Sequence, residues 1–83
     1  MREIRWTNEA ILALASLRGA ERQSLFERLD LVAQFPAMYP TRQRGRFADL
    51  RYFVLENRWI VYYRGNENEV LVFDIVPALA RPR

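Results

Sequence analysis

The basic side chains of this chain could do chemistry, and their spacing is uneven. The stretch TRQRGRFADLR, residues 41–51, carries Arg42, Arg44, Arg46 and Arg51. The chain has no lysine and no histidine, so all 13 of its basic side chains are arginines. The planar guanidinium group binds phosphate or carboxylate through two parallel hydrogen bonds. The chemistry that this stretch predicts is therefore the binding of an anion.

The net charge of +3 is confined to one segment. Residues 42–58 hold five arginines against Asp49 and Glu56, whereas positive and negative charges cancel on either side of this segment. A local arginine excess is typical of a surface that meets nucleic acid or an acidic peptide. An ordinary solvated surface is the alternative, and the charge alone does not decide between the two.

Proton transfer would need other side chains. Cleavage of RNA by its 2′-hydroxyl needs a base, an acid and charge stabilisation at the phosphate. Arginine suits the last role but is a poor base, because its pKa stays above about 12. The candidates for proton transfer are carboxylates and tyrosines: Glu56, Asp49, Asp74, Tyr52, Tyr62 and Tyr63. Without histidine or cysteine, a transition-metal or haem cofactor is not expected.

Each of these residues also has an ordinary structural interpretation. A strand arginine is most often a surface residue, and a glutamate beside a turn, such as Glu56, is most often a solvated carboxylate. Tyr62 and Tyr63 are adjacent, so they point to opposite faces of a strand and at least one belongs to the core. The other could stack on a base or on a protein side chain.

The composition predicts one small folded domain over residues 1–83. About half of the residues are apolar and 13% are aromatic, which is typical of a globular chain. No apolar run approaches the roughly 18 residues that a membrane span needs. The N-terminus MREIRW does not resemble a signal peptide, so a cytoplasmic protein is expected.

The first half of the chain predicts a strand and two helices. Alternation of Ile4 and Trp6 with polar residues indicates a strand over 3–6. Thr7 can cap a helix that starts with NEAILALASL and ends near Gly19. Apolar residues at helical spacing predict a second helix over 20–35, which Pro36 ends. These two helices would form a helical hairpin.

The second half predicts a loop and three strands. Two prolines and a glycine indicate a loop over 36–45. A turn is expected at 65–68, where Gly and Asn tolerate positive φ. The predicted strands span 46–56, 59–64 and 69–76, the last closed by Pro77.

The fold class that follows is α+β, with the order β-α-α-β-β-β. The helical hairpin packs on one face of a small antiparallel sheet, because each helix has one apolar stripe to bury. The opposite sheet face is then half solvated. The pattern over 46–56 does not assign its core face, because neither side of that strand is fully polar.

The element order and several short motifs resemble the RelE/ParE toxin superfamily over residues 3–76. The motifs are Trp6-Thr7, NEA, the FP that ends the second helix, DLR, RWIVYYR and EVLVFDIV, and IVYYR is the most specific. The resemblance implies a bacterial or archaeal toxin of a type II toxin–antitoxin pair. Its partner would be a cognate antitoxin whose partly disordered segment folds on the toxin as a hetero-oligomer. Some members of the superfamily cleave mRNA in the ribosomal A site, and others poison DNA gyrase.

The match to the ribonuclease branch is incomplete. That branch commonly opens its motif with an arginine. Arg58 lies at or one residue before that place, and Trp59 is the alternative occupant. Pro77 stands near the usual histidine, Arg81 is the only basic residue nearby, and the lysines of that branch are absent. These departures favour the ParE-like members.

The candidate residues form two groups. Those for catalysis are Arg51, Arg58, Arg81 and Glu56. Those for binding a target or antitoxin are Arg42, Arg44, Arg46, Arg64 and Tyr62. The resemblance therefore implies a growth-inhibiting toxin that acts on gyrase or on translation. A ribosome-dependent mRNA endonuclease and a degenerate, non-toxic antitoxin-binding module are the alternatives.

Overall fold

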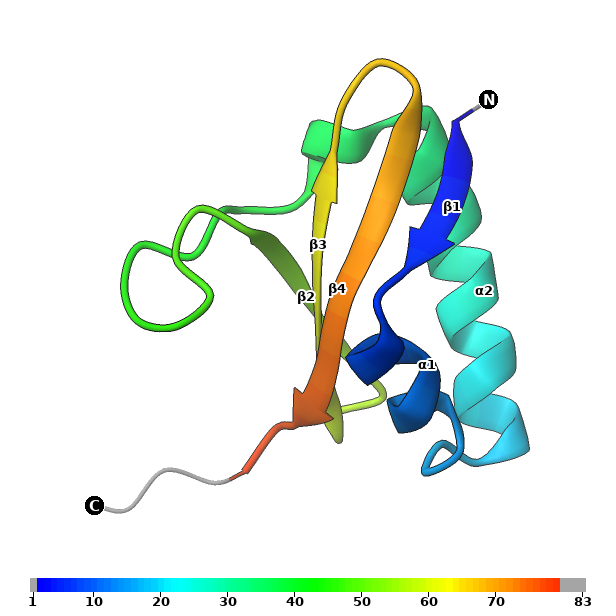
Figure 1. Cartoon of the computed structure of the whole chain (residues 1–83). Helices are drawn as coiled ribbons and strands as arrows, with labels where there is room; N and C mark the ends of the chain where they lie inside the picture. The colour runs from blue at the N-terminus through cyan, green and yellow to red at the C-terminus, as the bar shows by residue number, and fades with distance from the viewer. Residues whose placement is uncertain (1, 80–83) are drawn as a thin grey trace.

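The computed structural model describes residues 2–79, which form a small α+β domain (Figure 1). The order β-α-α-β-β-β is as predicted. None of the helices within 2–79 is both long and apolar enough to cross a bilayer. The elements are β1 (Glu3–Trp6), α1 (Asn8–Leu14), α2 (Gly19–Gln34), the short 3-10 helix η1 (Pro36–Met38), β2 (Arg51–Leu55), β3 (Trp59–Gly65) and β4 (Glu69–Pro77).

The four strands form one sheet in the order β1-β4-β3-β2. Strands β2, β3 and β4 make the predicted antiparallel meander. Strand β1 pairs with β4 in parallel, with Ile4 beside Val70, so the sheet is mixed and the expectation of an antiparallel sheet was wrong. The two helices between β1 and β2 carry the chain to the far edge of the sheet. Strand β2 runs in the same direction as β1, and the two reversals at the β2–β3 and β3–β4 turns return β4 beside β1 in that direction.

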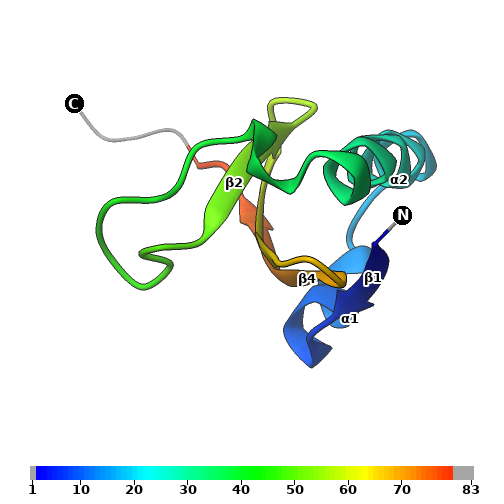
Figure 2. The same cartoon turned by 90° about the horizontal axis from the view of Figure 1, so that it is seen from above.

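Helix α2 covers one face of the curved sheet, as Figure 2 shows from above. Its buried residues Leu25, Leu29 and Val32 recur at the predicted helical spacing. They join Val61 and Val72 of the sheet in one core cluster. Burial of each such side chain contributes about 1.5–3 kcal/mol, so this layer holds the domain together.

Helix α1 is shorter than predicted and lies apart from α2. Thr7 caps it as expected, since its Oγ1 accepts a hydrogen bond from the Ala10 N–H at 3.1 Å. The helix ends at Leu14, because the amides of Ser16 and Leu17 donate to carbonyls only three residues back. Gly19 does not end this helix and instead begins α2.

The packing of α1 also differs from the predicted hairpin. It lies beyond the end of β1 and beside β4, rather than along α2 (Figures 1 and 2). The Thr7 hydroxyl donates to the Phe73 carbonyl of β4 at 2.6 Å. Because β1 stops at Trp6, α1 covers the part of the β4 edge that β1 leaves open.

Strand β2 begins at Arg51, five residues later than predicted. Residues 46–49 form a turn, and the positive φ of Asp49 (71°) interrupts the extended backbone. Within β2, Phe53 and Leu55 are buried, whereas Val54 is 44% exposed. The structure therefore assigns Arg51, Phe53 and Leu55 to the helix-covered face, and Tyr52 and Val54 to the opposite one.

The two hairpin turns differ from each other, and the one at 65–68 does not use the positive φ expected there. Between β2 and β3, Glu56 and Asn57 take positive φ, and the Arg58 N–H donates to the Leu55 carbonyl. Between β3 and β4 no residue takes positive φ. Instead, the Asn66 side-chain oxygen accepts hydrogen bonds from the amides of Asn68 and Glu69, which is an Asx turn.

Candidate functional site

The sheet face opposite α2, here called the open face, carries a stack of aromatic rings. Phe47 lies on Tyr62 with ring centroids 4.0 Å apart and planes 15° from parallel. The Tyr52 ring centroid is 6.1 Å from that of Tyr62. Tyr62, a predicted binding residue, is only 3% exposed. It cannot stack on a base while Phe47 occupies its face, and the half-buried Phe47 is the ring that a partner would meet.

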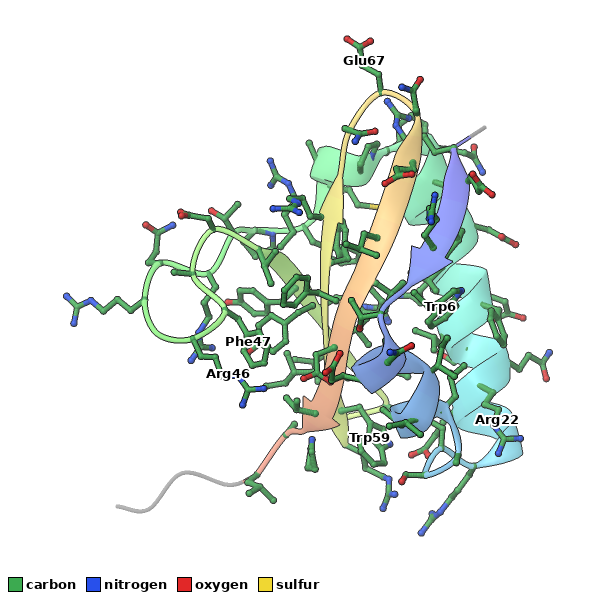
Figure 3. The ribbon with its side chains drawn as sticks, in the orientation of Figure 1. Trp6, Arg22, Arg46, Phe47, Trp59 and Glu67 are labelled. Atoms are coloured by element: carbon green, nitrogen blue, oxygen red, sulfur yellow. The ribbon has the colours of Figure 1, made fainter. Side chains whose placement is uncertain are left out.

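Arg46 reaches the same face beside Phe47, as Figure 3 shows. Its guanidinium lies 3.9 Å from the Asp74 carboxylate and 5.0 Å from the centre of the Phe47 ring. The Arg46 side chain is 79% exposed, so this contact contributes at most about 1 kcal/mol. Asp74 is held mainly by the amide of Ile75, which donates to it at 2.8 Å. Most donors of Arg46 therefore remain in contact with solvent.

The segment between η1 and β2, residues 41–50, is here called the arginine loop. It is closed by backbone hydrogen bonds from the Arg42 amide to the Leu50 carbonyl (2.7 Å) and from the Asp49 amide to the Arg42 carbonyl (2.9 Å). Gly45 takes φ 87° at the tip, a conformation that favours glycine. Arg44 and Arg46 project from a loop that is fixed at both ends.

Arg51 belongs to the opposite side of the sheet. Its Nη1 donates to the Tyr39 carbonyl at 2.6 Å. The Tyr39 hydroxyl accepts a hydrogen bond from Arg28 Nε at 2.8 Å, and the Arg28 guanidinium lies 4.7 Å from the centre of the Phe53 ring. Arg51 and Arg28 thus fasten the segment after η1 to β2, which is a structural task.

Arg58 is also committed to the fold. Its Nε donates to Glu21 Oε2 at 2.6 Å, and the Glu21 side chain is only 6% exposed. The Arg18 backbone N–H donates to the other carboxylate oxygen at 2.8 Å. This N–H and the Arg58 guanidinium lower the pKa of Glu21 against the opposing effect of burial.

Trp59 completes this arrangement, and we call the three residues Glu21, Arg58 and Trp59 the Glu21 cluster. The Arg58 guanidinium lies 5.5 Å from the centre of the Trp59 ring. The buried indole N–H has no partner that meets hydrogen-bond geometry. It adds, after the Arg18 N–H and the Arg58 guanidinium, to the lowering of the pKa of the Glu21 carboxylate. The cluster ties the β2–β3 turn to the start of α2.

The remaining predicted residues are dispersed. Glu56 accepts a hydrogen bond from the Ser24 hydroxyl of α2 at 3.1 Å, on the helix-covered side. Arg64 is exposed near the far end of β3. Asp49 is exposed in the arginine loop, and Tyr63 is fully buried in the core. Arg81 lies outside the described residues.

The structure therefore brings together Arg46, Asp74 and Tyr62, but not Arg51, Arg58 and Glu56. Glu56 and Arg58 lie in the β2–β3 turn beside the start of α2, whereas Arg51 lies at the other end of β2. Residues 2–79 enclose no pocket for a small ligand and hold no cluster of three potential metal ligands. A flat, arginine-rich surface of this kind can bind a large anionic partner better than it can enclose a substrate.

Two contributing residues were not found from the sequence. Phe47 follows the polar stretch TRQRGR, and an aromatic side chain in a polar loop is the signal that could have identified it. Glu21 stands three residues after Arg18, at the spacing of a capping interaction. The spacing of Arg18 and Glu21 can be read from the sequence. The pairing of Glu21 with Arg58, which is 37 residues away, cannot.

No protein-family model matches the chain, and no curated protein matches its sequence. What the protein does must therefore be inferred from the arginine loop and the open face beneath it.

Proposed function

We propose that this protein is the toxin of a type II toxin–antitoxin pair and acts by binding its target, as ParE-like members of the superfamily that it resembles do. The element order β-α-α-β-β-β agrees with that resemblance. One observation favours binding over RNA cleavage: Arg51, Arg58 and Glu56 are engaged in separate structural contacts on the helix-covered side. The target would be DNA gyrase or the translating ribosome, and a cognate antitoxin would neutralise the toxin in the cytoplasm as a hetero-oligomer.

The arginine loop is the surface that we assign to the target or the antitoxin. Within residues 2–79, Arg42 and Arg44 form no ion pair, and that of Arg46 is long and exposed. Exposed guanidinium groups attract an anionic surface at long range, and salt weakens this attraction. Phe47 beside them adds an apolar contact that salt does not screen.

Controlled expression in a bacterial host tests this proposal. Growth should stop on induction, and the double substitution Arg44→Ala/Arg46→Ala should restore it while the protein stays folded. Arg5→Ala is the matched control, because Arg5 is exposed and forms an equally long ion pair, 3.8 Å to Glu69, on another strand. Growth that continues with folded wild-type protein would exclude an active toxin and leave a non-toxic binding module.

A supercoiling assay with purified gyrase then separates the targets. Inhibition that depends on Arg44 and Arg46 would support the gyrase branch. Translation assays with intact messages address the ribosome. A toxin that inhibits neither would contradict both proposed targets.

A ribosome-dependent ribonuclease is the second candidate, and one observation favours it. Asp74 is a largely buried carboxylate 3.9 Å from Arg46, next to Tyr62 on the open face. A carboxylate base beside a phosphate-binding guanidinium is what 2′-hydroxyl attack needs. The cleaving residues would then be Asp74 and Arg46 rather than Glu56 and Arg58.

Primer extension on translated messages distinguishes the two candidates. New codon-linked 5′ ends that appear on induction, and that disappear with Asp74→Asn, would support cleavage. Growth arrest without such ends would support the binding toxin.

A further inference from the structure

Helix α1 presents an apolar face to solvent. Leu12 is 73% exposed and Ile11 is 52% exposed, and Ala15 follows one turn after Ile11 on the same outward side. Glu9 is the only charged residue of the helix. A helix with apolar residues on both its inward and its outward side is typically packed against other protein on both sides. The outer side of α1 therefore lacks a partner within the described chain.

The two ends of α1 carry opposite charges. Glu9 lies in the first turn of α1. At the other end, Arg22 of α2 donates from Nε to the Leu14 carbonyl at 3.1 Å, which holds its guanidinium at the C-terminus of α1. Figure 3 shows Arg22 in the first turns of α2, on the outside of the molecule. Along α1 the surface thus changes from acidic through apolar to basic.

This arrangement, acidic then apolar then basic along α1, is complementary to the same arrangement running in the opposite direction. A two-fold axis that passes beside the middle of α1, perpendicular to the helix, makes two copies of it antiparallel, so the first turn of each lies against the last turn of the other. Glu9 of one copy then faces Arg22 of the second, and the same contact occurs twice. Leu12 and Ile11 lie between these contacts, and the small Ala15 allows the two helices to approach closely.

We propose that the protein forms a two-fold symmetric homodimer through the outer face of α1. The occupant is a second copy of this chain, because the charges at the two ends of α1 complement those of the same surface rotated by the two-fold axis. A helix of seven residues is about 10 Å long, so the interface is smaller than the roughly 800 Å² per partner of a standard complex. The dimer is consequently weak and dependent on concentration. The arginine loop lies on the other side of the molecule and stays exposed in it (Figure 1).

Sedimentation equilibrium of the purified chain tests the dimer. Over concentrations from about 1 µM to about 1 mM, the average mass should rise from 9.9 kDa toward twice that value. Leu12→Asp should raise the midpoint of this rise at least about tenfold. Leu31→Asp is the matched control, since Leu31 is a 45% exposed leucine on α2 and should leave the midpoint unchanged. A mass of 9.9 kDa throughout, or a dimer that Leu31→Asp breaks and Leu12→Asp does not, would overturn the proposal.

A charge exchange tests the antiparallel arrangement. Glu9→Arg and Arg22→Glu should each weaken self-association, because each places like charges at both ends of the interface. An equimolar mixture of the two variants should associate again, since both contacts are then attractive. Circular dichroism must first show that both variants keep their helix content, because Arg22 also caps α1. Folded variants that fail to associate when mixed would exclude this arrangement, and Leu12→Asp still tests the α1 interface if Arg22→Glu does not fold.

Discussion

The two faces of the sheet use the same residue type in different ways. On the helix-covered side, Arg51 and Arg58 each donate to an oxygen at 2.6 Å, one to a carbonyl and one to a buried carboxylate. On the open face, Arg46 lies 3.9 Å from its carboxylate and is 79% exposed. Charge does not distinguish these arginines, but the lengths of their contacts do. An arginine with a short contact to a part-buried partner holds the fold, whereas one with a long, solvated contact is available to a partner.

The physical basis of this difference is desolvation. A guanidinium or carboxylate removed from water must recover its lost hydrogen bonds inside the protein, and removing either partner leaves the other uncompensated. A solvated pair loses little when it separates, because water replaces the contact. Substitutions on the two faces should therefore separate stability from function.

The largest effect is expected from Phe53→Ala on the helix-covered side. Phe53 is 3% exposed, and its ring packs against Tyr39 and Tyr63 with centroids 4.9 and 6.2 Å away. The cavity should reduce the free energy of unfolding by about 3–5 kcal/mol, a large part of the roughly 5–15 kcal/mol of a small domain. Urea unfolding measures this loss. An unchanged midpoint would mean that the core does not depend on this layer.

The next effect concerns alkaline pH. Burial raises the pKa of Tyr63 to about 12, above the roughly 10 of an unfolded tyrosine. The contribution of this tyrosine to stability is thus fully present below pH 10 and is lost as the pH rises toward 12. Melting temperatures between pH 9 and 12 should fall steeply. The variant Tyr63→Phe lacks the hydrogen bond to the Pro36 carbonyl and should be about 1 kcal/mol less stable at neutral pH. Its melting temperature should fall less steeply between pH 9 and 12, because it has no hydroxyl to ionise at this position.

Acid pH should act on the Glu21 cluster. The pKa of Glu21 is lowered, chiefly by the Arg18 backbone N–H, so the carboxylate stabilises the fold above its ordinary pKa of about 4.5 and loses this effect as pH falls through the lowered value. Glu21→Gln should therefore melt earlier at pH 7 and depend less on pH between 7 and 3. Glu27→Gln, an exposed glutamate on the same helix, is the control. If the stabilities of the two variants depend on pH in the same way between pH 7 and 3, Glu21 is not the cause of the acid dependence.

Phe47→Ala is the open-face counterpart of Phe53→Ala and should affect stability less. Removing its stack on Tyr62 should lower the free energy of unfolding by about 1 kcal/mol, the range of an aromatic pair. Its effect on growth inhibition should be larger than its effect on stability. A loss comparable with that of Phe53→Ala would show that the arginine loop is part of the core, contrary to the distinction between the faces.

The smallest effect on stability is expected from Arg44→Ala and Arg46→Ala. Each should change the free energy of unfolding by no more than about 0.5 kcal/mol, as is usual for surface substitutions. Arg58→Ala is the opposite case, because it leaves the buried Glu21 carboxylate without its cation. Thermal melts of the three variants compare them directly. Equal destabilisation by Arg46→Ala and Arg58→Ala would contradict the assignment of different tasks to these arginines.

Local patterns were sufficient for some elements. The second helix was predicted over 20–35 and spans Gly19–Gln34, because Leu25, Leu29 and Val32 repeat at helical spacing and Pro36 stops it. The last two strands were found within one residue at each end. The separation of Tyr62 and Tyr63 onto opposite faces also followed from strand alternation.

The candidate site was predicted only in part. The exposed arginines of the loop were expected, but the start of β2 was placed at residue 46, which would have aligned Phe47 with the strand. Arg51 and Arg58 were expected at a functional surface, and their partners Tyr39 and Glu21 lie 12 and 37 residues away in the chain. The pattern of neighbouring residues carries no information about contacts between residues so far apart in the chain.

The sequence by itself determined the α+β class, the element order and the position of the arginine excess, because propensity, capping and charge act over a few neighbouring residues. Only the tertiary structure decided that β1 pairs with β4 in parallel, that the arginine loop folds over the open face, and which arginines make short contacts with distant parts of the chain. Those outcomes depend on which distant surfaces bury one another. The same guanidinium group is a structural tie at Arg58 and an exposed charge at Arg46, because Arg58 contacts its carboxylate at 2.6 Å, whereas Arg46 lies 3.9 Å from its own and is 79% exposed.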